Sequence, residues 1–156
     1  MAIILENLKF AFLLPREHTK DYFMKVIVLL GRLLFAMLFL INCSNMFTPM
    51  SVQYAAAQGV PIPNILVPLA GVIAILGALS IAIGLKARFG AWLIVLFLVP
   101  VTFFMHRYWT IKDPMTYQMQ KGAFLHNLAL TGAAFLISYF GAGPWSFDAK
   151  KDGYAE

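Results

Sequence analysis

The sequence predicts an all-α integral membrane protein whose core is a bundle of four transmembrane helices, with the N and C termini cytoplasmic. Of its 156 residues, 61% are hydrophobic and 12% are charged, whereas a soluble domain is about half apolar and about a quarter charged. Four stretches, near 26–46, 63–85, 89–109 and 122–141, have the roughly 20 apolar residues that a helix needs to cross a hydrocarbon core about 30 Å thick.

The four spans divide the chain into an N-terminal cytoplasmic or interfacial segment (1–24), a four-helix transmembrane domain (25–142) and a cytoplasmic tail (143–156). The first segment carries charges within its apolar stretch and lacks a small-residue cleavage site, so we expect it on the membrane surface rather than as a removable signal peptide. Pro63 and Gly84 mark the start and end of the second span. Residues 48–62 predict a short interfacial helix that ends in a turn.

The orientation follows from the lysine and arginine residues beside the spans, which collect on the cytoplasmic side of membrane proteins. Eight lie on one side and three on the other, so the richer side should be cytoplasmic, in a bacterial or archaeal inner membrane. The richer side has Lys9, Arg16, Lys20, Lys25, Lys86, Arg88, Lys150 and Lys151, and the poorer side has Arg107, Lys112 and Lys121.

Several function classes are excluded by what the sequence lacks. Cys43 is the only cysteine, so the chain has no internal disulfide, no CxxC pair and no cysteine-based zinc cluster. No phosphate-binding loop, dinucleotide fingerprint or HExxH motif occurs. The net charge is +5, and the basic residues that produce it lie mainly beside the apolar spans. This position indicates membrane lipid rather than nucleic acid as a partner.

Small residues on the second and fourth spans predict close helix packing. We expect one stripe on each span to face a neighbouring helix, and the second-span stripe is also a possible contact with a partner protein. The two stripes are Gly71, Ala74, Ala78 and Ala82, and Asn127, Thr131 and Ala134.

Arg32 is the most informative single residue, because a charge inside a membrane helix costs about 2.5–3.5 kcal/mol on insertion scales. None of the seven acidic residues lies in a predicted span, so no intramembrane carboxylate is available as its partner. The same absence argues against a proton-coupled transporter. Two interpretations of Arg32 stay open: contact with a cofactor, or hydrogen bonds to headgroups and backbone carbonyls.

Polar residues at three helix ends form a second constellation, which antiparallel topology should bring to one membrane level. Two histidines at similar depth suit the carbonyl oxygens of a quinone, or less readily haem. Nearby methionines are a weak signal for copper(I), and we assign no metal ligands. The constellation contains Asn42, Asn45, Met105, His106, Arg107, Trp109, His126 and Asn127.

A series of short motifs lies in and beside these spans. In chain order the motifs are GRLLF at 31–35, FLIN at 39–42, GVPIP at 59–63, LAG at 69–71, GL at 84–85 with Arg88, FMH at 104–106, FLHNLAL at 124–130 and GPWSFD at 143–148. In this order they resemble the DoxX family of small four-helix membrane proteins. Some members of that family look like small subunits of a thiosulfate:quinone oxidoreductase. The resemblance implies a redox-associated membrane role.

The leading hypothesis is therefore a DoxX-like subunit of a redox or respiratory, quinone-linked membrane complex, working with other membrane subunits. Its candidate cofactor contacts are Arg32, His106, Arg107, His126 and Asn127. Whether the chain itself is an enzyme stays open. The alternative is a non-catalytic accessory or scaffold subunit that stabilises a larger membrane assembly. A small-solute permease is a third hypothesis, which would require several copies of so small a bundle.

Overall fold

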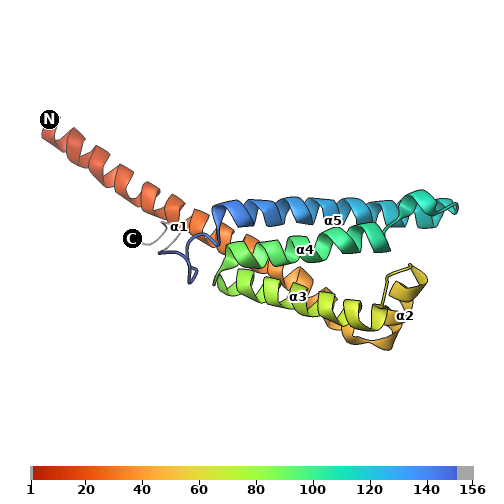
Figure 1. Cartoon of the computed structure of the whole chain (residues 1–156). Coiled ribbons are helices and arrows are strands. Elements are labelled where there is room, and N and C mark those ends of the chain that lie inside the picture. The colour runs from red at the N-terminus through yellow and green to blue at the C-terminus, as the bar shows by residue number, and fades with distance from the viewer. Residues whose placement is uncertain (1, 151–156) are drawn as a thin grey trace.

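A computed structural model of the chain describes residues 2–150, with side chains from residue 20 onward. The described residues form helices joined by short turns, without strands. The helices are α1 (Ala2–Cys43), η1 (Ser44–Phe47), α2 (Pro49–Ala57), α3 (Pro63–Ile83), α4 (Ala87–Met105), η2 (Tyr108–Thr110) and α5 (Pro114–Phe140). In Figure 1, α3, α4, α5 and the second half of α1 run side by side, and α2 lies across one end of the bundle.

Within the described residues, four helices are long and apolar enough to span a membrane: Lys20–Phe47, Pro63–Ile83, Ala87–Thr110 and Pro114–Phe140. The predicted fold class is thus confirmed as an all-α bundle of four membrane-spanning helices. The predicted signals at both ends of α3 are also present, since Pro63 opens the helix and Gly84 closes it with φ +72°. The short helix predicted within 48–62 is α2, capped by Thr48, which accepts a hydrogen bond from the Ser51 backbone N–H.

Two helix boundaries differ from the sequence prediction. The first helix is continuous from Ala2 to Cys43, 42 residues or about 63 Å of helix, so it extends well past the bundle (Figure 1). The last helix begins at Pro114 rather than near 122. That start has a clear physical cause, because the Asp113 carboxylate accepts from the Thr116 backbone N–H at 2.8 Å and Pro114 needs no donor partner. The surface position of residues 1–24 and the cytoplasmic location of the tail stay predictions, and residues 151–156 lie outside the described part.

Close packing of small residues holds the bundle together, as the sequence predicts. Ala74 and Ala78 on α3 are completely buried, and Gly71 is buried against Met46 and Phe47. A methyl group added at Gly77 would lie 2.8 Å from the Gly90 carbonyl of α4. The helices α3 and α4 can therefore approach closely only because neither residue has a side chain.

One use of this stripe proposed from the sequence is wrong. Gly71 and Ala78 do not offer a surface to another protein, because both are buried inside this chain. Leucine at either position would disrupt the bundle itself. On α5, Thr131 and Ala134 are likewise buried, which confirms internal packing for these two residues of the second stripe, whereas Asn127 is only half-buried.

Candidate functional site

A polar cleft lies between α1 and α5 at the end of the bundle where α1 stops. The helices pack in the order α1 on α3, α3 on α4 and α4 on α5, whereas α1 and α5 hardly touch within the described residues. The resulting gap has a volume of about 250 Å³. We call it the polar cleft, and its lining is Leu38, Phe39, Asn42, Cys43, Phe97, Leu98, Val101, His106, His126, Asn127 and Leu130.

Part of the lining of the polar cleft is apolar and buried. Phe97 and Leu98 of α4 are buried, and the Phe39 ring meets the Phe97 ring edge to face with centroids 6.2 Å apart. This ring contact joins α1 to α4 beside the cleft. A bound molecule would therefore meet both aromatic rings and hydrogen-bonding side chains.

Three predicted site residues come together here: His106, His126 and Asn127 all line the cleft. His106 caps the C-terminal end of α4, and its Nδ1 is 2.8 Å from Oε1 of Gln120 on α5. This contact engages Nδ1 and leaves Nε2 without a hydrogen-bond partner in the described part of the chain. Gln120 therefore fixes the orientation of His106.

The other cleft residues keep unused hydrogen-bonding groups. Asn42 donates from Nδ2 to the Leu38 carbonyl at 2.7 Å, which leaves its Oδ1 as an acceptor. The side chains of His126 and Asn127 make no hydrogen bond to any residue in the described part of the chain. Within a membrane, a hydrogen bond to a polar partner lowers the free energy of such groups. The cleft thus offers both donors and acceptors to a small polar molecule.

Cys43 contributes its side chain to the same wall and is 2% exposed. A buried cysteine behaves as a small hydrophobic residue. Its burial separates it from the exposed, low-pKa thiols that act as nucleophiles.

Arg107 points elsewhere, although it follows His106 directly. Its Nη2 donates to the Gln58 carbonyl in the loop between α2 and α3, and its Nε is buried without a partner. Gly59, next to Gln58, has φ +79°, a conformation that glycine adopts without strain. Arg107 therefore fastens this loop to the end of α4, and it lines neither the polar cleft nor the larger cavity described below.

Arg32 lies at the opposite end of the bundle. Ten residues separate it from Asn42, about 15 Å along α1. Its Nη1 donates to the Ala142 carbonyl at 2.8 Å and its Nη2 to the Trp145 carbonyl at 2.9 Å. Of the two interpretations of this charge, the structure shows hydrogen bonds to backbone carbonyls. Arg32 is thus a tether for the segment that follows α5, well away from the other candidate residues.

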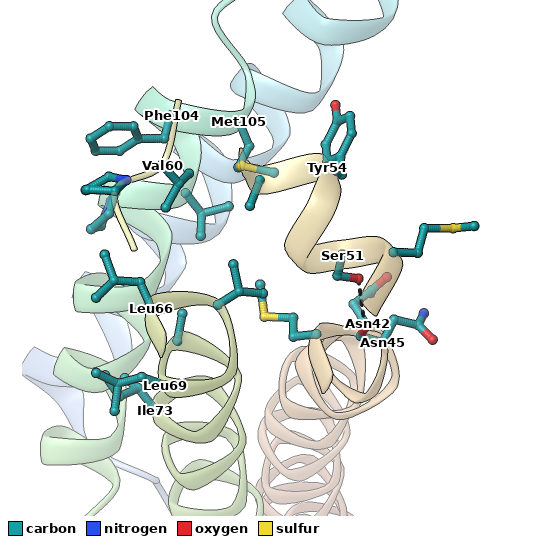
Figure 2. Close-up of a pocket in the computed structure, with 18 of the residues that line it drawn as sticks. Asn42, Asn45, Ser51, Tyr54, Val60, Leu66, Leu69, Ile73, Phe104 and Met105 are labelled. Carbon is teal, nitrogen blue, oxygen red and sulfur yellow. Dashed lines mark hydrogen bonds between the residues drawn. The ribbon is translucent and has the colours of Figure 1, made fainter. Parts of the chain in front are cut away.

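A second, larger cavity adjoins the polar cleft. Its volume is about 710 Å³, and the side chains around it are predominantly aliphatic or methionine (Figure 2). We call it the apolar cavity. It is lined by Asn42, Asn45, Met46, Met50, Ser51, Tyr54, Ala55, Val60, Pro61, Leu66, Val67, Leu69, Ala70, Ile73, Leu96, Pro100, Val101, Phe104 and Met105.

The methionines that gave the weak copper signal are divided between two places. Met46, Met50 and Met105 line the apolar cavity, whereas Met115 and Met119 on α5 are 84% and 65% exposed. Within the described residues, no three histidine, cysteine, aspartate or glutamate side chains are grouped to hold a metal ion. Met46, Met50 and Met105 thus contribute flexible apolar side chains to the apolar cavity.

Sequence reasoning missed Gln120, the partner of His106, because it placed residue 120 in a loop. The Asp113-Pro114 pair was the available signal, since an N-cap aspartate followed by proline begins a helix. It also missed the apolar cavity, which depends on how far apart the helix ends lie.

Comparison with known proteins identifies the family. No curated protein and no solved structure matches the chain. The DoxX family model matches residues 27–107, from the middle of α1 through the end of α4. The match includes Arg32, His106 and Arg107, and α5 adds His126 and Asn127 outside it. With more than half of its length matched and four helices able to span a membrane, the chain is a multi-pass membrane protein that belongs to the DoxX family.

Proposed function

We propose that this protein is the small membrane subunit of a quinone-linked redox complex and that its polar cleft binds the quinone ring. The observation that carries the proposal is the grouping of His106, His126 and Asn127 around one small cleft. Side chains with unused donors and acceptors at the end of an apolar bundle are typical of a site that orients a ligand.

The residues present fit a quinone. The ring would lie against the buried side chains of Phe97 and Leu98, and its two carbonyl oxygens would accept hydrogen bonds from the Asn127 amide and the His126 imidazole. A bound quinone would supply two-electron, two-proton redox chemistry. Of the cation candidates, Arg107 and Arg32 are engaged with backbone carbonyls, so this proposal gives the ring contacts to neutral groups. Another subunit would supply the electron donor.

The proposal includes a location in a bacterial or archaeal cytoplasmic membrane with both termini cytoplasmic. Support comes from the eight-to-three division of lysine and arginine between the two sides of the spans. This orientation puts the polar cleft on the outer side and the Arg32 tether on the inner side. Reporter fusions at the C-terminus and in the α4–α5 connection test it, and an active periplasmic reporter at the C-terminus would reverse the orientation.

Binding of a short-chain benzoquinone to the purified protein in lipid nanodiscs tests the function. His126→Ala and Asn127→Ala should each weaken binding by about five- to a hundredfold, the loss expected when a ligand oxygen is left without its hydrogen bond. The control is Asn64→Ala, because Asn64 is an exposed polar residue of α3 that lines neither cavity. In the native assembly, replacing both His106 and His126 by alanine should abolish quinone-dependent turnover while the bundle remains folded.

Equal affinity of all these variants for the quinone would remove the proposed site. The scaffold role is the second candidate, and the lightly buried α5 favours it, since only Thr131 and Ala134 of that helix are buried. Purification of the native assembly separates the two. Partner subunits that stay bound when both histidines are replaced, in an assembly without quinone, would assign the chain a scaffold role.

A further inference from the structure

We infer that the apolar cavity holds the long hydrocarbon chain of the same ligand whose ring lies in the polar cleft. The ligand class is then a membrane-dissolved quinone with a prenyl or alkyl tail, rather than a small water-soluble one. This inference rests on the proposed function, because it begins from a ring in the polar cleft.

The two cavities are neighbours that share part of their wall. Asn42 and Val101 line both of them. Asn42 lies in the last turn of α1, where its amide is anchored to the Leu38 carbonyl, and Val101 lies on α4. This shared wall is where a chain attached to a ring in the polar cleft would enter the larger space.

The chemistry of the apolar cavity suits a hydrocarbon chain. Figure 2 shows Leu66, Leu69 and Ile73 in succession along one wall. Ser51, on the opposite side, has its hydroxyl satisfied by the Asn45 carbonyl at 2.8 Å. Apart from Asn42, Asn45, Ser51 and Tyr54, the lining has no polar side chain. Most of its surface therefore suits a hydrocarbon chain, which has no polar groups to leave unpaired. The volume of about 710 Å³ is within the range of roughly 300–1,000 Å³ found for ligand pockets.

The apolar cavity also opens sideways. Leu69 on α3 is 48% exposed and Leu96 on α4 is 58% exposed, so part of the lining faces the hydrocarbon of the bilayer. A quinone dissolved in the membrane can enter from there. At the end of the bundle, α2 covers the cavity with Ala55, which is 2% exposed, and Arg107 fastens the loop that follows.

A chain that moves from lipid into this cavity gains little hydrophobic free energy, because lipid tails are as apolar as the lining. The cavity should therefore fix where the chain lies more than how tightly the ligand binds. The position of the chain is the quantity to measure.

The test is photoaffinity labelling of the full chain in nanodiscs of phosphatidylcholine and phosphatidylglycerol. The probe is a benzoquinone whose alkyl chain ends in a diazirine, and the modified residues are identified by peptide mass spectrometry. We expect adducts on Met46, Ile73 and Met105, which line the cavity. An excess of unlabelled prenylquinone should prevent them.

A matched pair of variants on α3 sharpens the test. Leu69→Trp places a larger side chain at the rim of the cavity and should lower labelling of Met46 and Ile73 about tenfold, as overpacking of this size predicts. Leu76→Trp is the control, because Leu76 is 54% exposed, lies two turns further along the same helix face and lines neither cavity. Both positions are exposed enough for tryptophan to be accommodated without unfolding.

Three outcomes would overturn the inference. Adducts on outward-facing residues such as Leu76, with normal binding of a tail-less quinone, would place the chain in the bilayer and leave the proposed function intact. A diazirine-bearing phospholipid that labels the cavity and resists displacement by prenylquinone would assign the space to a bilayer lipid. Absence of binding by both the tail-less and the long-chain quinone would remove the proposed function together with the inference.

Discussion

Replacing Arg32 by methionine should release the segment after α5 while leaving the bundle assembled. Arg32 is 6% exposed and connects α1 to the carbonyls of Ala142 and Trp145. The same segment is held by Asp148, whose backbone N–H donates to the Gly84 carbonyl at 2.8 Å. The Asp148 carboxylate also accepts from the Ala87 backbone N–H at 3.0 Å and so caps α4.

The expected size follows from opposing terms. Two hydrogen bonds from a charged donor contribute about 1.5–3 kcal/mol each, or about 3–6 kcal/mol in total. Removing a charge from a membrane helix returns about 2.5–3.5 kcal/mol. The overall stability should therefore change by an amount between a gain of about 0.5 kcal/mol and a loss of about 3.5 kcal/mol. The local stability of the segment after α5 should fall by the full contribution of both hydrogen bonds. The free energy recovered by removing the charge stabilises α1 in the membrane and does not hold the segment in place.

Hydrogen–deuterium exchange measures this difference directly, and the Asp148 amide is its reporter. Exchange across 142–148 should accelerate by two or more orders of magnitude in Arg32→Met, since each 1.4 kcal/mol corresponds to about tenfold. Exchange in α3 and α4 should change far less. Arg32→Lys keeps a donor and should give an intermediate rate. Unchanged protection of 142–148 in the methionine variant would refute the tether.

Two further predictions concern helix packing and capping. Gly77→Ala should destabilise the protein by about 1–3 kcal/mol, because the new methyl group meets the Gly90 carbonyl of α4. Gly132→Ala has open space and should instead stabilise α5 by about 0.5–1 kcal/mol. Thermal unfolding in detergent compares the two, and an equal loss in both variants would contradict the close α3–α4 contact. Hydrogen bonds from the Thr116 hydroxyl and backbone N–H hold the pKa of the Asp113 carboxyl below its usual value. Because the folded pKa is lowered, this capping contribution is complete above the ordinary pKa of about 4 and is lost as the pH falls through the lowered value. Asp113→Asn should lack this acid response, and an identical decline of helix stability at low pH in both proteins would contradict the assignment.

Much of the fold could be predicted from sequence because the bilayer imposes length and composition on every span. Pro63 and Gly84 set the ends of α3 through local backbone chemistry, and small residues such as Ala78 predict close packing. The start of α5 was missed although the Asp113-Pro114 pair marks it. The length of α1 beyond the bundle was also missed, since charged residues within its first part interrupt the apolar pattern without preventing a helix.

The candidate site could be predicted only in part. Antiparallel topology brings His106 and His126 to one level, and the structure shows both in the same cleft. For Arg32 the sequence left backbone carbonyls as one of two open interpretations. The direction of Arg107 could not be foreseen, because its partner is a backbone carbonyl, which carries no sequence signature. The backbone at His106, with φ −119° and ψ 47°, leaves the helix and directs the next residue toward the α2–α3 loop.

The most direct test of the central claim is the nuclear magnetic resonance spectrum of protein labelled with ¹⁵N-histidine in nanodiscs, recorded as a short-chain benzoquinone is added. The sequence contains three histidines, and His18 precedes Asn42 by 24 residues, so it serves as the internal reference. We predict that the imidazole resonances of His106 and His126 shift together and saturably, while that of His18 does not, and that Asn127→Ala weakens the response. Resonances of His106 and His126 that stay unchanged at saturating quinone would contradict the claim that the polar cleft is a quinone site.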